Sequence, residues 1–187
     1  DVVSHAIDDA GVIFVIYAGG GMNNKIARVS PTFNNNLWVA PSTFVVFTEQ
    51  GNKSQYQWSG NLSSNGFNCL AVNANYLFYY DGLNLAAYNK TTGALVASTT
   101  VSGVTLKRQG GIAVDDCNNL YLGGNGSILT FNFNGSTFSP LNSIPLATST
   151  PSTYVYDIKL DKNNKILYTS GSGFVAVYPA AQSLACA

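Results

Sequence analysis

Short hydrophobic runs alternate along this chain with clusters of Asp, Asn and Gly, and one such pattern occurs four times. In each copy, a β-branched or aliphatic run meets a polar cluster and then a Leu or Ile followed by an aromatic residue. This pattern predicts a strand, a tight turn and a second strand, because short polar side chains hydrogen-bond the local backbone of a turn. The four copies span residues 6–14, 71–78, 113–121 and 159–168.

Each predicted hairpin is followed by a second turn and a third strand. The third strands are predicted at residues 25–29, 85–88, 128–131 and 174–178. A further turn, at Thr92-Gly93 or Asn134-Gly135, leads into a fourth hydrophobic run such as residues 94–97. Four short antiparallel strands per repeat are typical of a propeller blade. The pattern therefore predicts an all-β fold, a β-propeller of four-stranded antiparallel blades.

The spacing of the copies divides the chain into blades. The copies start 65, 42 and 46 residues apart, counted from Ala6 to Ala71, Ala113 and Lys159. The last two spacings match the roughly 40–50 residues of a blade. We predict blade one at about 1–48, a loop insertion at about 49–65, blade two at 66–103, blade three at 109–146 and blade four at 154–187. An extra hairpin in blade one is the alternative explanation of the longer first spacing.

About four blades are close to the lower limit for a closed ring. The first unit begins at its innermost strand, and the last completes its third strand near Tyr178, leaving residues 179–187 for a poor fourth strand. We therefore expect an incomplete propeller, part of a larger one in a longer parent polypeptide, of which this chain is a mature or excised portion. A closed four-bladed ring and a β-sandwich of eight or more strands are the alternatives.

Composition supports strands over helices and excludes several function classes. Charged residues make up 10% of the chain, whereas about 25% is usual in soluble domains. Nine Lys and Arg balance nine Asp and Glu, and without a basic block the chain lacks the electrostatic footprint of nucleic-acid binding. The chain contains no run of 18 apolar residues, so no membrane-spanning segment is predicted. We expect a soluble all-β protein.

Several stretches resemble a known group of proteins. The sequences GFNCLAV at 66–72, YLFYYDG at 76–82 and YNKTTGAL at 88–95 resemble large secreted Bacteroidota proteins with NHL-like propeller repeats, often upstream of gliding-motility-associated C-terminal domains and exported by type IX secretion. GIAVDDCNNLYLG at 111–123 and YDIKL at 156–160 are similar to the following blades of that family. The resemblance covers most of residues 60–180. It implies a secreted or cell-surface adhesin or filament component, whose partners are the rest of a larger parent polypeptide or other surface proteins and glycans.

Candidate catalytic groups are few, and we assign no catalytic residue, metal site or cofactor. His5 is the only histidine, and no G-x-S-x-G nucleophile motif accompanies it. The acid pairs Asp8-Asp9 and Asp115-Asp116, with Asp161 in the fourth copy, occupy the same hairpin turn, so the turn explains them. A calcium site at residues 115–119 is disfavoured because the acid spacing of a calcium loop is missing.

Aromatic residues near loops are the candidate binding residues. Amphipathic rings give contact area at low entropy cost, which suits sugar or protein recognition. Trp58, Tyr56, Tyr79 and Tyr80 are the candidates, and alternation predicts that one ring of the Tyr79-Tyr80 pair faces a neighbouring blade.

Three cysteines, Cys69, Cys117 and Cys186, leave the disulfide state open. One disulfide with a leftover thiol is expected in an oxidising compartment, and buried thiols are the alternative.

The leading functional prediction is a non-enzymatic extracellular propeller module with a structural or adhesive role. A propeller-type glycan hydrolase or lyase is one alternative, and it would depend on acids such as Glu49 and Asp157 near the central channel. A carbohydrate-binding module that uses Trp58 is another. Propellers perform both kinds of work, so the fold does not decide between them.

Overall fold

The computed structural model describes residues 2–17, 25–29, 32–34, 37–39, 45–46, 68–102, 110–147, 154–171 and 173–180. All regular secondary structure in these ranges is β-strand, arranged as four antiparallel sheets and one separate hairpin. No helix within these ranges is long and apolar enough to cross a membrane.

The strands follow one another in chain order within each sheet. The first sheet contains β1 (Val2–Ile7), β2 (Ile13–Tyr17), β3 (Lys25–Val29) and β6 (Val45–Val46). The second contains β7 (Leu70–Val72), β8 (Tyr76–Tyr80), β9 (Asn84–Asn89) and β10 (Leu95–Thr100). The third contains β11 (Ile112–Val114), β12 (Asn119–Gly123), β13 (Ser127–Phe133) and β14 (Phe138–Pro140), and β15 (Ile144–Pro145) also pairs with β13. The fourth contains β16 (Val155–Asp161), β17 (Ile166–Gly171) and β18 (Phe174–Pro179), and β4 (Thr32–Asn34) with β5 (Leu37–Val39) forms the hairpin.

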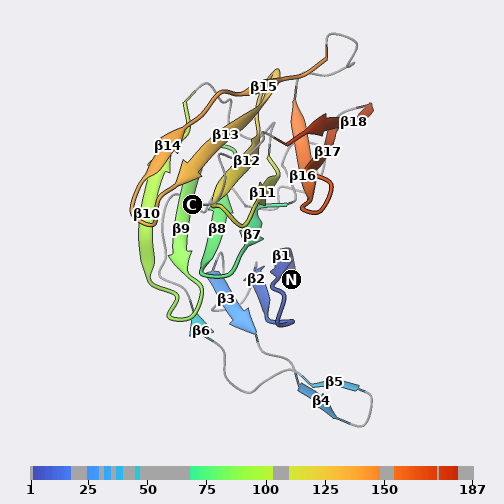
Figure 1. Ribbon diagram of the computed structural model, residues 1–187. Coiled ribbons are helices and arrows are strands. Elements are labelled where there is room, and N and C mark those ends of the chain that lie inside the picture. The colour runs from blue at the N-terminus through green and yellow to red at the C-terminus, as the bar shows by residue number, and fades with distance from the viewer. Residues whose placement is uncertain are drawn as a thin grey trace.

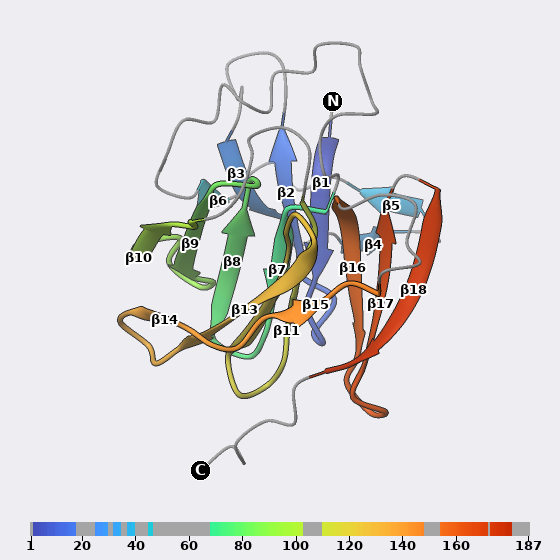
Figure 2. The same ribbon diagram turned by 90° about the horizontal axis from the view of Figure 1, so that it is seen from above.

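The four sheets lie side by side in an arc (Figure 1). Each sheet starts with its innermost strand: β1 contacts β7, β7 contacts β11, and β11 contacts β16. Figure 2 shows these four strands gathered near the middle of the molecule. Antiparallel sheets whose first strands surround a common axis form a propeller-like arrangement. The structure therefore confirms the predicted all-β, propeller-like fold and excludes two sheets packed face to face.

The recurring polar clusters build the first turn of each sheet. Asp8 Oδ1 accepts the backbone N–H groups two and four residues ahead, at 3.0 and 2.9 Å. Asp115 Oδ1 does the same at 2.9 and 2.8 Å, and Asp161 Oδ1 accepts the N–H groups two and three residues ahead at 3.0 Å each. Gly11 and Asn118 each follow their Asp by three residues and take positive φ angles of 79° and 61°. Gly and Asn tolerate that conformation best, which is why these residue types recur at this turn.

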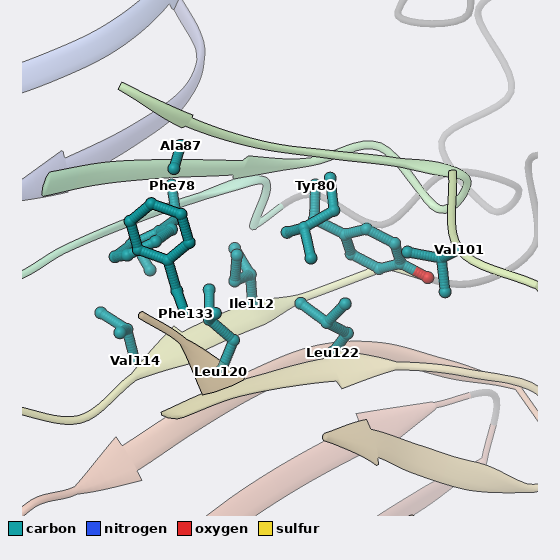
Figure 3. Close-up of a cluster of buried hydrophobic side chains, with 11 residues drawn as sticks. Phe78, Tyr80, Ala87, Val101, Ile112, Val114, Leu120, Leu122 and Phe133 are labelled. Atoms are coloured by element: carbon teal, nitrogen blue, oxygen red, sulfur yellow. The ribbon is translucent and has the colours of Figure 1, made fainter. Parts of the chain in front are cut away.

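Hydrophobic side chains fill the space between neighbouring sheets. Phe14, Ile16 and Ile26 of the first sheet pack against the second sheet in one buried cluster. A second cluster joins the second and third sheets and contains Phe78 and Phe133, whose rings meet edge to face with centroids 5.6 Å apart (Figure 3). A third cluster joins the third and fourth sheets. The core is therefore divided into layers, one between each pair of sheets.

The predicted third strands lie within β3, β9, β13 and β18, and the fourth hydrophobic run of the second unit overlaps β10. The first unit also contains the β4–β5 hairpin between β3 and β6. An extra hairpin in blade one was the alternative explanation of the longer first spacing. The predicted loop insertion at 49–65 lies outside the described residues.

An ion pair between the β1–β2 turn and the β9–β10 turn joins the first two sheets and makes the stability of the fold depend on pH. Lys90 Nζ lies 2.9 Å from Asp8 Oδ2, and the Asp8 side chain is 6% exposed. Burial tends to raise the pKa of this carboxyl, but Lys90 and the N–H groups of Val12 and Ala10 outweigh burial and lower it below 3.8. A lowered pKa stabilises the fold above the unfolded-state value and loses that effect as pH falls through the folded-state value.

We therefore expect Asp8→Asn, which keeps the turn acceptor but removes the charge, to cost about 1 kcal/mol at pH 7. The difference from wild type should shrink below about pH 4. Urea unfolding midpoints from pH 7 to pH 2 measure it. Asp161→Asn, at the equivalent turn, is the matched control with a smaller expected cost. A difference that stays constant down to pH 2 would contradict the assignment.

Candidate functional site

The four inner strands line one groove of about 300 Å³ near the middle of the arc. Its described walls come from residues 5–7 of β1, 70–72 of β7, 112–114 of β11 and 158–160 of β16, with Asn68 and Lys162 beside them. Four segments that are far apart in sequence thus converge on one concave surface. Ligand sites in folded proteins are concave surfaces with a few convergent polar groups.

The backbone supplies part of the polar lining. In an antiparallel ladder, every second residue of an edge strand turns its N–H and C=O away from the neighbouring strand. On β7 these residues are Leu70 and Val72, and on β11 they are Ile112 and Val114, because the residues between them bond to β8 and β12. β7 and β11 therefore turn backbone donors and acceptors away from their own sheets, and one of these acceptors, Ile112 O, is bound by the Asn68 side chain.

Three cationic or basic side chains also line the groove. His5 and Lys159 are exposed and come from the first and fourth sheets, at its two ends. Lys162 Nζ lies 2.7 Å from Asp116 Oδ1, which links the fourth sheet to the third. No carboxylate is among the described residues that line the groove. The groove therefore favours an anionic or hydroxyl-bearing ligand.

Asn68 fixes the positions of three inner strands relative to one another. Its side chain is buried, and Nδ2 donates to Ile158 O at 3.1 Å and to Ile112 O at 3.3 Å. Next to it, Cys69 N donates to Ser4 Oγ at 3.1 Å, which connects the second sheet to the first. Residues 68–69 therefore hold all four sheets around the groove through polar contacts.

Asn68→Ala is expected to lower the free energy of unfolding by about 1–3 kcal/mol, because it removes the amide that donates to two buried carbonyls and leaves both carbonyls without this hydrogen bond. Asn134→Ala, which removes the cap of an exposed turn, is the control and should cost about 0.5–1 kcal/mol. Chemical denaturation of both variants measures the difference. Equal costs would show that Asn68 does not organise the inner strands.

The structure corrects the predicted aromatic binding residues. Tyr79 and Tyr80 are 2% and 0% exposed, so neither ring lies on the open surface where a loop residue was expected. Sheets cover both faces of β8: Tyr79 faces the first sheet and Tyr80 the third, where its hydroxyl donates to Gly123 O at 2.9 Å. Burial raises the pKa of both phenols. Tyr56 and Trp58 lie outside the described residues.

The acids act as the turn interpretation predicts. The carboxylates of Asp8, Asp115 and Asp161 accept hydrogen bonds from their own turns. Asp157 Oδ1 accepts the N–H of Ile158 at 2.8 Å and is not among the groove residues, and Glu49 lies outside the described part of the chain. In the described ranges no group of three His, Cys, Asp or Glu side chains could hold a metal ion.

The cysteines fall into two kinds. Cys117 is disulfide-bonded. Cys69 is not part of a disulfide and is 1% exposed within the first core layer. Since the chain has three cysteines, Cys186, outside the described residues, is the remaining candidate partner of Cys117.

Local patterns identify few of the groove residues. The sequence analysis assigned His5 no catalytic role, and it did not identify Asn68, Lys159 or Lys162 as site residues. The usable signal is their register, because His5 and Lys159 lie in or beside the first strand of their repeats. Only the arrangement of the sheets shows that these strands meet.

Known proteins match this chain in structure but not in sequence. A scan against models of protein families finds no match, and no curated protein matches. A Bacteroides uniformis protein assigned as a 6-phosphogluconolactonase is 17% identical with a TM-score of 0.60, over 97% of this chain and 51% of that one. U3-55K is 15% identical with a TM-score of 0.60, over 95% and 48%. A gluconolactonase from Xanthomonas campestris is 16% identical with a TM-score of 0.59, over 94% and 55%.

These likenesses show the fold, and the chain spans about half the length of the structures it matches. They also overturn the prediction of a non-enzymatic module. That prediction assumed that a propeller without a recognisable catalytic motif works through contacts alone, yet two of these three structures carry the names of lactonases. The chain therefore has a propeller-like fold that these two lactonases share.

Proposed function

We propose that this chain is part of a propeller-type hydrolase that opens the lactone of a sugar acid in the groove between the four inner strands. The names of the two lactonases support the reaction class. The observation that carries the proposal is the groove lining, in which the His5 imidazole and the Lys159 ammonium group share one concave surface with the backbone of the inner strands.

The same lining separates lactone hydrolysis from glycoside hydrolysis. Glycosidases use two carboxylates on either side of the scissile bond, and the described groove residues include none. Ester hydrolysis needs a base for water and a positive group near the carbonyl oxygen. His5 and Lys159 are of these types. The groove therefore supports opening an ester better than cleaving a glycan.

The proposed reaction is the addition of water across the ring ester. His5 takes a proton from a water molecule as the water oxygen attacks the lactone carbonyl carbon, and the Lys159 ammonium group stabilises the negative charge that develops on the carbonyl oxygen. The ring C–O bond then breaks and the leaving oxygen receives the proton, which gives the open-chain hydroxy acid. Lys159 favours an anionic substrate, such as the phosphorylated lactone in the name of the Bacteroides protein, whereas Lys162 is paired with Asp116.

We also propose that the four sheets are four blades of a larger propeller. The chain spans about half of each matched structure, which supports this proposal. The rest of the ring would come from a longer parent polypeptide, as the repeat pattern predicts, or from another chain.

Location outside the cell remains a proposal. The disulfide-bonded Cys117 supports an oxidising compartment, because disulfides persist there and are rare in the cytosol. The Bacteroidota relationship and type IX export stay predictions from the resemblance.

The chain is expected to hydrolyse gluconolactone or its 6-phosphate faster than the uncatalysed reaction, measured as acid release at constant pH. His5→Ala should lower kcat/KM about 10²–10⁴-fold, the usual contribution of a general base. Lys159→Ala should raise KM more for the phosphorylated than for the neutral lactone.

Lys165→Ala, at the β16–β17 turn outside the groove, is the matched control and should leave both constants unchanged. A wild-type chain without lactonase activity, or a His5→Ala variant as fast as wild type, would refute the proposal.

A further inference from the structure

The side chain amide of Asn68 is oriented by two strands that belong to other sheets. Its Nδ2 donates to Ile158 O of β16 at 3.1 Å and to Ile112 O of β11 at 3.3 Å, and the residue is only 9% exposed. A carboxamide nitrogen carries two hydrogens, and these two carbonyls accept both of them. The hydrogen bonds therefore determine which end of the amide is the nitrogen, and Oδ1 is the end that remains.

Oδ1 of Asn68 is an acceptor that the protein itself does not use. Within the described ranges, the two bonds from Nδ2 are the hydrogen bonds of this side chain. Oδ1 is not among the fully enclosed polar atoms that lack a partner, so solvent still reaches it. Since Asn68 lines the groove between the inner strands, the open side of its amide faces that groove.

The amide lies at the same level of the groove as His5. His5, Ile112 and Ile158 hold equivalent places in their repeats, each one residue before the position from which the repeat spacing is counted. Asn68 bonds the carbonyls of two of these three residues, and the carbonyl of Ile158 belongs to the peptide group that leads into Lys159. The unused acceptor therefore lies at the level of the two residues that carry the proposed chemistry.

The chemistry of the groove shows which group of a ligand could pair with Oδ1. The ammonium groups of Lys159 and Lys162 only donate hydrogen bonds, and His5 is the base of the proposed reaction. A ring ester and a carboxylate only accept, so neither can donate to Oδ1 of Asn68. A hydroxyl group can donate, and the lactone of a sugar acid carries one on the carbon next to its carbonyl carbon.

We infer that Asn68 Oδ1 forms a subsite for this neighbouring hydroxyl, so that the groove takes 2-hydroxy lactones and the 2-hydroxy acids that they release. His5 and Lys159 act on the carbonyl carbon at this level of the groove, and the carbon that bears the 2-hydroxyl is bonded directly to it. A ligand without the 2-hydroxyl leaves a buried acceptor unpaired, which lowers its affinity. This inference deepens the proposed lactonase function and rests on it.

Binding of the open-chain acids tests the subsite without any turnover. The wild-type chain should bind gluconate about 10- to 100-fold more tightly than 2-deoxygluconate. The affinity for 3-deoxygluconate, which keeps the 2-hydroxyl, should lie within about threefold of that for gluconate. NMR titration of the full 187-residue chain gives the dissociation constants, and gluconate should shift the side chain amide signals of Asn68.

Asn68→Ala removes the acceptor, so the preference for gluconate over 2-deoxygluconate should disappear. Ser4→Ala is the matched control, because it removes the hydroxyl that accepts the Cys69 N–H at 3.1 Å and leaves the amide of Asn68 in place. This variant also loses a buried hydrogen bond between sheets, but it should keep the wild-type preference. Circular dichroism shows whether each variant is folded, and the three acids on the wild-type chain decide the question if Asn68→Ala does not fold.

A wild-type chain that binds gluconate and 2-deoxygluconate equally, or binds no gluconate at millimolar concentration, would overturn the inference. A preference that survives in Asn68→Ala, or that is lost in a folded Ser4→Ala, would also contradict it. A chain that shows the preference but hydrolyses no lactone would keep the subsite and refute the lactonase proposal. A chain that hydrolyses the lactones of both acids equally well would keep the lactonase proposal and refute the subsite.

Discussion

Gly111→Ala is expected to destabilise the fold by about 3–5 kcal/mol, enough to unfold a marginal domain. Gly111 has a φ of +86°, a conformation that L side chains rarely adopt. A Cβ at this position would lie 2.7 Å from Asp157 Cα and from Ile158 N. These are backbone atoms of β16, so the third and fourth sheets would have to separate.

Gly126→Ala is the matched control for this substitution. Gly126 has a similar φ of +77°, but nothing lies within 4 Å of its added Cβ. It should lose only the conformational cost, about 1–2 kcal/mol. Urea denaturation of both variants gives the two values. If they were equal, the close approach of β11 to β16 would be refuted.

Loss of the disulfide is the second large expected effect. Cys117→Ser should lower the free energy of unfolding by about 4 kcal/mol, because it removes the disulfide of Cys117, and a bond to Cys186, the partner we predict, would close a loop of about 70 residues in the unfolded chain. Denaturation with and without a reductant measures this cost. Wild type under reduction should match the variant.

Cys186→Ser and the double variant should lose no more than Cys117→Ser, since all three remove the same bond. Peptide mapping should recover Cys117 linked to Cys186. A Cys186→Ser variant as stable as wild type would contradict this pairing.

The fold was largely predictable because its signals are local. The side chains of Asp8, Asp115 and Asp161 accept hydrogen bonds from the backbone of their own turns, and Gly11 and Asn118 take the positive φ. Four or five consecutive residues therefore determine each turn. Strands on either side of such turns have few alternatives.

The site was much less predictable because its signals are long-range. Nothing in the neighbours of Asn68 indicates that its amide reaches Ile112 and Ile158, which lie 44 and 90 residues away. Alternation predicted one buried ring in the Tyr79-Tyr80 pair, whereas both are buried because sheets flank β8 on both sides.

The functional prediction failed for a related reason. It relied on the lack of a recognisable catalytic motif around the single histidine, whereas the groove collects His5, Asn68 and Lys159 from three sheets. A single histidine looks isolated along the chain, but a propeller brings distant inner strands to one axis.

An amide NMR titration with gluconate 6-phosphate, the expected product, tests most directly that the inner strands form one ligand site. We predict saturable shifts of the amides of His5, Val72, Val114 and Lys159 together, one from each sheet, and loss of these shifts in Lys159→Ala. Saturable shifts confined to a single sheet or to the outer strands, or no shifts at millimolar ligand, would contradict the account.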